Sequence, residues 1–162
     1  MIETRTEAAT PLILGWREWV ALPDLGIPRI KAKIDTGART SALHAWNIRP
    51  FVRDGKIYVR FIVHPLQRDN RREEHCVAKV VDQRYVRSSN GHRERRYVIE
   101  TTIKLGNHVV PVEISLTNRD EMGFRMLLGR NGLRSGILVA PRSSYRLGKP
   151  RSKPTKRLKR PK

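Results

Sequence analysis

The sequence is poor in cysteine and in aromatic residues, and it has no long apolar run. Its single cysteine, Cys76, excludes an internal disulfide and is compatible with a reducing compartment. No apolar stretch approaches the length that spans a membrane, and residues 1–7 carry acids where a signal peptide would carry bases. We therefore expect a cytoplasmic protein that has no membrane partner.

Motifs for cofactors and metals are also missing. The chain has no Gly-x-x-x-x-Gly-Lys-Ser/Thr phosphate loop, so ATP has no recognisable site. A zinc site needs three or four converging ligands, and the candidate side chains follow no established spacing. These candidates are His44, His64, His75, Cys76, His92 and His108. The sequence predicts no cofactor and no metal, and Cys76 is expected to be a small buried residue.

Positive charge is abundant and unevenly placed. The formal net charge is +19, and from Pro141 onward the chain has ten bases and no acid, which leaves 24 bases against 15 acids before that point. Prolines recur in this basic segment and disfavour regular structure. We predict an N-terminal extension over residues 1–11, one domain over 12–140, and a disordered basic tail over 141–162 that could contact RNA or the ribosome.

Patterns with a period of two predict an all-β domain. Strands are expected over residues 12–22, with a turn following, and over 27–34 and 57–63. Two hairpins are expected, one around Ser88-Ser89-Asn90-Gly91 and one around Gly106-Asn107. No heptad, long amphipathic helix or internal repeat is present. We predict a small closed barrel with one short helix after Asn131, ending near Gly136.

Two motifs carry the candidate chemistry. Asp35-Thr36-Gly37-Ala38 directly follows the strand expected over 27–34, and Met126-Leu127-Leu128-Gly129-Arg130-Asn131 lies far downstream. The acid can exchange a proton, Thr36 can fix the turn by hydrogen bonding, and Gly37 allows close approach of backbone.

Together these motifs resemble the retropepsin-like aspartic proteases. The run from Lys31 to Ala45 is more closely similar to the bacterial and archaeal family known as ATP-dependent zinc proteases, and the likeness extends over residues 13–140. The resemblance implies a barrel in which Asp35, Thr36 and Gly37 are catalytic. It also implies that Ala38, Gly129, Arg130 and Asn131 support them, with Gly129 beneath the acid-bearing loop and Thr36 bonding across a dimer. Arg39 departs from the pattern, because retroviral enzymes have an acid there.

A single Asp-Thr-Gly implies a homodimer. Two-lobed aspartic proteases contain two such motifs, so here the second carboxyl must come from a second copy. Two carboxyls at close range share one proton, and the ionised one can deprotonate water while the protonated one polarises the scissile carbonyl.

The hairpin around residues 88–91 lies in sequence where a retropepsin has its flap. Arginines flank it and favour a substrate that carries carboxylates; those we expect to bind substrate are Arg84, Arg87, Arg93 and Arg95, with Arg96 beside them. Some relatives in the resembled family are associated with a ligase that appends glutamates to a ribosomal protein. We therefore predict an aspartic peptidase that cleaves glutamate-rich segments.

Three alternatives remain at this point. The basic charge would also suit a barrel without enzymatic activity that binds RNA or the ribosome, although few aromatic side chains are available for base stacking. The name of the resembled family suggests a zinc-dependent peptidase. The barrel could also be a dimeric binding module that has lost catalysis.

Overall fold

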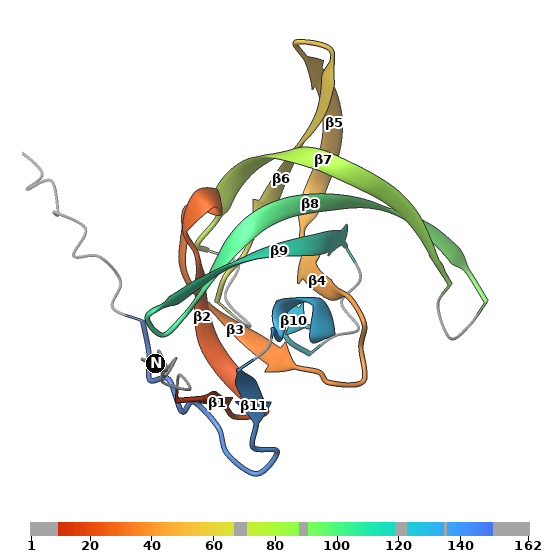
Figure 1. Cartoon of the computed structure of the whole chain (residues 1–162). Coiled ribbons are helices and arrows are strands. Elements are labelled where there is room, and N and C mark those ends of the chain that lie inside the picture. The colour runs from red at the N-terminus through yellow and green to blue at the C-terminus, as the bar shows by residue number, and fades with distance from the viewer. Residues whose placement is uncertain (1–9, 67–70, 88–90, 119–122, 135, 151–162) are drawn as a thin grey trace, which may run out of the picture.

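The computed structural model describes residues 10–66, 71–87, 91–118, 123–134 and 136–150, and these residues form an almost entirely β structure (Figure 1). The strands are β1 (Leu12–Leu14), β2 (Arg17–Leu22), β3 (Ile27–Ile34), β4 (Ser41–His44), β5 (Trp46–Arg53), β6 (Lys56–Val63), β7 (Glu74–Arg87), β8 (Arg93–Leu105), β9 (His108–Thr117), β10 (Met126–Leu128) and β11 (Ile137–Val139). The described residues include two single-turn 3₁₀ helices, η1 (Pro23–Leu25) and η3 (Arg130–Gly132). Among the described residues, no helix has the length and apolar character to span a membrane.

Nine strands form one curved sheet in the order β2-β3-β10-β4-β9-β8-β7-β6-β5. The pair Ala21 and Lys104 joins β2 back to β8, which closes a ring of strands. Beyond this ring, β7 and β8 continue as a long hairpin, and β5 and β6 rise as a second one (Figure 1). A separate parallel pair, β1 with β11, lies beneath the ring.

The core fills the ring because alternate strand residues point inward. In β3, Ile27, Ile30, Ala32 and Ile34 are all buried, and the polar residues between them are not. The core continues along β8, where Ile99, Ile103 and Leu105 are fully buried. The loop that begins at Asp35 therefore follows a strand that is firmly held on its inner face.

The all-β class predicted from the sequence is confirmed. The strands expected over 27–34 and 57–63 appear as β3 and β6, and both expected hairpins appear as β7–β8 and β8–β9. The segment expected as one strand over 12–22 is two strands, because the chain turns away at Gly15 and Trp16. The tip residues 88–90 lie outside the described residues.

The helix expected after Asn131 differs from the prediction. The chain forms only the 3₁₀ turn η3, which starts at Arg130, and its N-cap residue, Gly129, makes no side-chain cap. Asn131 lies within the turn, and its side chain bonds to other strands instead of capping a helix. A longer helix therefore does not form at this point.

The first part of the predicted basic tail lies on the domain. The carboxylate of Glu18 is fully buried and accepts hydrogen bonds from the backbone N–H groups of Gly15 (2.6 Å), Arg146 (3.0 Å) and Leu147 (3.1 Å). The Tyr145 ring stacks on Trp19 with 6.3 Å between centroids. Packing thus continues past residue 140, while residues 1–9 and 151–162 lie outside the described residues and the rest of the domain division stays a prediction.

Candidate active site

Asp35 begins a tight turn directly after β3. Its backbone N–H donates to the Leu128 carbonyl (2.9 Å), and its side-chain Oδ1 accepts from the Gly37 N–H (2.9 Å). The Ala38 N–H donates to the Asp35 carbonyl (3.2 Å), which closes the turn. The Asp35 side chain is half-buried, and Thr36 and Gly37 are exposed. The acid is therefore held at the surface in one orientation by its own loop.

The second motif lies against this turn, as the resemblance implies. Strand β10 pairs in parallel with β3, which places Leu128 opposite Ile34. A Cβ atom on Gly129 would lie 2.2 Å from the Thr40 carbonyl oxygen and 2.9 Å from that of Ala38, so only glycine fits there. The Arg130 N–H donates to the Ala38 carbonyl (2.8 Å). Two motifs about 90 residues apart in the chain thus form one rigid unit.

Arg130 also holds the exposed tip of the turn. Its Nη1 donates to the backbone carbonyl of Thr36 at 3.0 Å, so the guanidinium holds the acid-bearing loop at the residue next to Asp35. The Asn131 N–H donates to the Arg39 carbonyl at 3.2 Å. At Arg39 the loop is therefore bound through backbone, which is consistent with the absence of the acid that retroviral enzymes have at this position.

Ser41 completes the connection, through partners that the sequence does not predict. Its buried hydroxyl donates to Oδ1 of Asn131 (2.6 Å) and accepts from the buried N–H of Gly129 (3.0 Å). The Nδ2 of Asn131 then donates to the Glu113 carbonyl (2.8 Å). A serine six residues after the acid is the only sequence signal, and by itself it predicts no partner.

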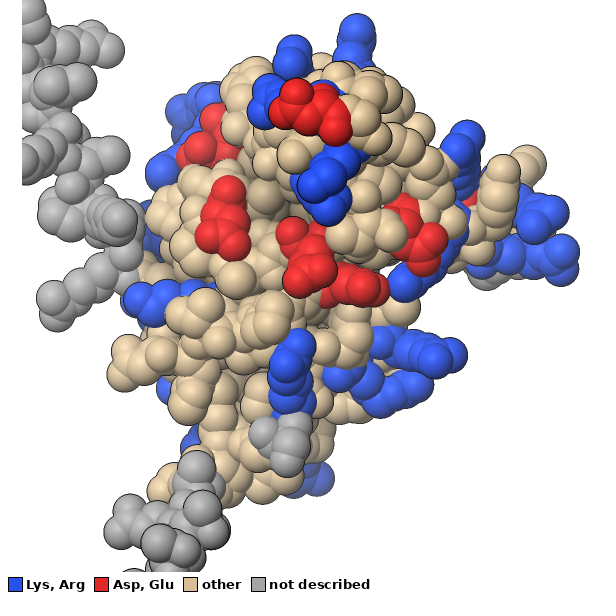
Figure 2. All heavy atoms as spheres, turned by 45° about the horizontal axis from the view of Figure 1, so that its top comes forward, with Lys and Arg blue, Asp and Glu red and all other residues tan. Residues whose placement is uncertain are grey.

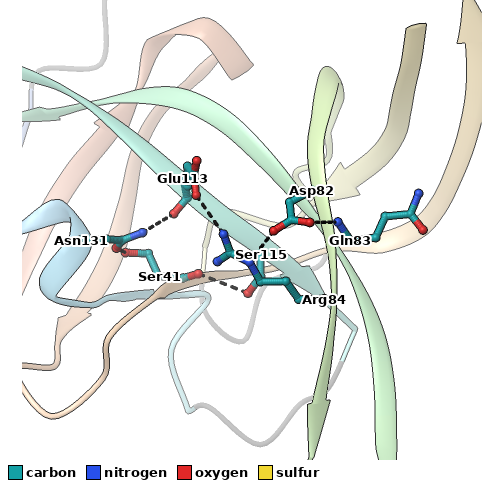
Figure 3. Close-up of polar contacts among 7 residues, drawn as sticks. All are labelled: Ser41, Asp82, Gln83, Arg84, Glu113, Ser115 and Asn131. Carbon is teal, nitrogen blue, oxygen red and sulfur yellow. Dashed lines mark hydrogen bonds and ion pairs between the residues drawn. The ribbon is translucent and has the colours of Figure 1, made fainter.

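A chain of polar contacts links this unit to the β7–β8 hairpin (Figure 3). Arg84 donates to the Glu113 carboxylate at 3.1 Å and to the Asp82 carboxylate at 2.7 Å. The hydrogen bond from Arg84 lowers the pKa of the Asp82 carboxyl, and the Gln83 backbone N–H acts in the same direction. Glu113 therefore connects the base of the hairpin to the acid-bearing loop. Its carboxylate accepts from Arg84, and its backbone carbonyl accepts from Asn131.

The arginines expected to bind substrate lie on two faces of the hairpin. Arg84 pairs with Arg96 and lies on the face that carries Asp82 and Glu94, whereas Arg87 pairs with Arg93 on the other face. Arg95 shares that second face, where it donates to Gln83. Figure 2 shows basic side chains around the margin of the molecule and along this hairpin at the right.

The four arginines therefore do not form the one cluster that the sequence suggests, because they lie on two faces. Arg84 contacts two carboxylates, those of Asp82 and Glu113. The exposed arginines that share one face are Arg87, Arg93 and Arg95, with Arg93 over the Tyr85 ring at 5.0 Å. A role for any of these four in substrate binding stays a prediction.

The candidate zinc ligands do not come together in the part of the chain that the structure describes, where no group of three or more His, Cys, Asp or Glu could hold a metal ion. His44 is buried and stacks on Trp46 at 3.8 Å, and Trp46 also contacts His64 at 4.3 Å. Burial, and to a smaller extent the charge of Glu74, raises the pKa of the Cys76 thiol to about 12, as expected for a buried residue that is not a nucleophile.

A family model described as RimB-like, "Retropepsin-like aspartic endopeptidase RimB", matches residues 13–150. The chain belongs to this family. The match includes both motifs of the candidate site and the segment that binds Glu18.

The similar proteins carry other names. The chain is 52% identical to a protein of Shewanella halifaxensis and 47% identical to one of Desulfotalea psychrophila, each over 84% of this chain, and both are named probable alpha-L-glutamate ligase. The chain spans only 30% and 29% of these relatives. A crystal structure of Lpg0085 from Legionella pneumophila, a protein of unknown function, matches with a TM-score of 0.71 and 28% identity over 84% of this chain and 98% of that one.

Proposed function

We propose that this protein is an aspartic endopeptidase that acts as a homodimer on acidic, glutamate-rich peptide segments. The observation that carries the proposal is the turn that presents one half-buried Asp35, braced by Gly129, Arg130 and Asn131. A single subunit supplies one catalytic carboxyl, so a two-fold dimer is needed to bring two of them together.

The proposed reaction needs only the two carboxyls and water. The ionised Asp35 takes a proton from water as the water oxygen attacks the scissile carbonyl carbon, and the protonated Asp35 of the other subunit donates a hydrogen bond to the carbonyl oxygen. The tetrahedral intermediate then breaks at the C–N bond, and a carboxyl proton passes to the leaving amine. The products are a carboxylic acid and an amine, and no covalent enzyme intermediate forms.

An acidic substrate is supported by two observations. Arg87, Arg93 and Arg95 share one exposed face of the hairpin, and guanidinium groups bind carboxylates well. Curated relatives that contain a stretch similar to this chain are named probable alpha-L-glutamate ligases. The product of such a ligase would be a glutamyl peptide, which a hydrolase of the proposed kind would cleave. A glutamylated ribosomal protein tail would be one substrate of this kind.

The direct test compares a peptide with a glutamate tail against the same peptide without it. Product masses should show cleavage of the tailed peptide by the wild-type protein and no cleavage by Asp35→Asn. Activity of Asp35→Asn at the wild-type rate would refute the aspartic mechanism. A strong chelator should leave the rate unchanged, whereas loss of the rate would favour the zinc-dependent alternative.

The dimer is tested by mixing subunits. An excess of Asp35→Asn protein should reduce wild-type activity, because most wild-type subunits would then pair with a partner that lacks the acid. The same excess of an unrelated protein should have no effect. Activity that is unchanged by the Asp35→Asn subunits would show that one chain works alone.

The arginine face is tested with two double variants. Arg87→Ala/Arg93→Ala should raise KM for a glutamate-rich peptide much more than for a neutral peptide. The matched control is Lys104→Ala/Arg142→Ala, which removes two exposed charges elsewhere. Equal effects of the two double variants would show that only total charge matters.

A further inference from the structure

The β5–β6 hairpin and the adjoining part of β7 present one exposed face that the peptidase proposal does not use. We call this the arm face, and it consists of Arg49, Phe51, Arg53, Lys56, Tyr58, Arg60 and Lys79. We infer that the arm face binds single-stranded nucleic acid. The inference depends neither on peptidase activity nor on Asp35.

Strand register places these residues on the same side of the sheet. Arg49 pairs with Arg60, Phe51 with Tyr58 and Arg53 with Lys56, and Tyr58 pairs in turn with Lys79 of β7. Cross-strand partners and every second residue along a strand share a face. The turn between the strands is tight, because Asp54 (φ 51°) and Gly55 (φ 74°) both have positive φ, as expected for a two-residue hairpin loop.

The opposite side of the same strands faces the core. Val59, Phe61 and Val63 are fully buried there, and Cys76 lies opposite Phe61. Toward the free end this inner side reaches solvent, at Pro50, Val52 and Ile57. The arm is therefore an amphipathic sheet with a fixed outer side, and a shift of register cannot hide its cations.

The charge on the arm face has one sign. Its five cations are exposed, and none forms an ion pair with a carboxylate among the described residues. This side of the sheet carries no acid in three stretches, which are residues 49–53 of β5, 56–62 of β6 and 75–79 of β7. Surfaces with both signs interspersed are usual for soluble domains, so a face with cations alone favours an anionic partner.

Aromatic rings lie among these cations, and they favour an anionic partner that also has rings to stack. Phe51 and Tyr58 are stacked with 5.8 Å between centroids, and Arg53 lies over both rings at 5.4 and 5.5 Å. Arg60 lies over Phe51 at 5.1 Å. Acidic peptides need only cations, whereas a single strand of nucleic acid offers phosphates to the guanidinium groups and bases to the rings. The combination therefore favours nucleic acid.

Binding can be measured by fluorescence anisotropy with the full chain and a labelled oligouridylate of about 12 nucleotides, from about 50 to about 200 mM salt. Arg53→Ala/Arg60→Ala should raise Kd about tenfold and reduce the slope of log Kd against log salt by about 1.4, or about 0.7 for each phosphate that is no longer neutralised. Tyr58→Leu should raise Kd about fivefold or more and leave that slope unchanged, because it removes stacking and no charge.

The control variant Lys104→Ala/Arg142→Ala removes the same charge from exposed positions outside the arm face and should change Kd less than about twofold. An equal loss of affinity in this control, or an unchanged Kd in Arg53→Ala/Arg60→Ala, would overturn the inference. Competition identifies the ligand: displacement by unlabelled oligouridylate or oligothymidylate supports nucleic acid, and their ratio separates RNA from DNA. Equal displacement by polyglutamate would overturn the choice of nucleic acid.

Discussion

The side chains of Ser41 and Asn131 are joined by a hydrogen bond of 2.6 Å, 90 residues apart in the chain. The same Ser41 hydroxyl accepts from Gly129, so one side chain binds two residues of the second motif. This pair of hydrogen bonds ties the loop that begins at Asp35 to η3. The stability of the candidate site should therefore depend on a residue that takes no part in the proposed chemistry.

Ser41→Ala should destabilise the protein by about 1–3 kcal/mol, because the buried Gly129 N–H loses its acceptor. Denaturant unfolding measures the change. Ser144→Ala is the matched control, since its hydroxyl accepts only from the partly buried Arg17 side chain among the described residues, and it should cost less. Equal costs would show that the connection between the motifs contributes little to stability.

Gly129→Ala should be more damaging than an alanine at an open glycine. The new Cβ would lie 2.2 Å from the Thr40 carbonyl oxygen, so the acid-bearing loop would have to move, at a cost of about 3 kcal/mol or more. Gly136→Ala meets nothing within 4 Å and has only the strain of its positive φ, about 1–2 kcal/mol. Thermal unfolding of both variants measures the difference, and equal midpoints would contradict it.

Glu18→Ala should release the segment that lies on β2. Three backbone N–H groups would lose a carboxylate acceptor, at a cost of about 3 kcal/mol or more in total. Limited proteolysis should then cut near Arg146, whereas the wild-type chain should resist cleavage there. Glu18→Gln keeps one acceptor oxygen, so its resistance to proteolysis should be intermediate. If Glu18→Ala resists proteolysis as well as the wild type does, other contacts hold the segment.

Cys76 should be unreactive in the native protein. Its pKa is raised to about 12 by burial, whereas the thiol of the unfolded chain ionises near its ordinary value of 9.0, so at pH 8 to 10 only unfolded chains present thiolate. Iodoacetamide should label native protein far more slowly than denatured protein. Rapid labelling of native protein would contradict the burial.

The same shift gives Cys76 a pH-dependent contribution to stability. Above about pH 9 the unfolded state binds fewer protons at this thiol than the folded state, so its contribution falls as pH rises through 9 toward 12. Comparison with Cys76→Val between pH 8 and 11 isolates this effect from lysine and tyrosine titration. A difference in stability that is independent of pH would contradict the shift.

Regular alternation is what made parts of the fold predictable. Inward and outward residues alternate over residues 30–34 and 59–63, so β3 and β6 appear as expected. Strand β4 gave no such signal because all four of its residues are buried. Strand β5 was missed because it is interrupted at Asn47, which has positive φ, and contains Pro50. Local pattern fails where a strand is buried on both sides or projects from the domain.

The site was predictable at its motifs and not at the partners that the fold brings to them. Asp35 and Gly129 follow from the resemblance, and the structure places them together. The pairing of Arg84 with Glu113 joins residues 29 apart, and the binding of Glu18 to Leu147 spans 129. Such partners depend on tertiary packing, so composition and spacing predict neither the carboxylates that Arg84 contacts nor the segment that Glu18 binds.

Among the described residues, three parallel strand pairs join distant parts of the chain: β1 with β11, β3 with β10, and β4 with β9. Contacts of this kind raise the relative contact order, and proteins dominated by them fold slowly. During synthesis, the loop at Asp35 can acquire its brace only after Arg130 has been made. A nascent chain therefore exposes the edges of β3 and β4 for most of its translation, and folding in the presence of a chaperone should raise the yield of native protein.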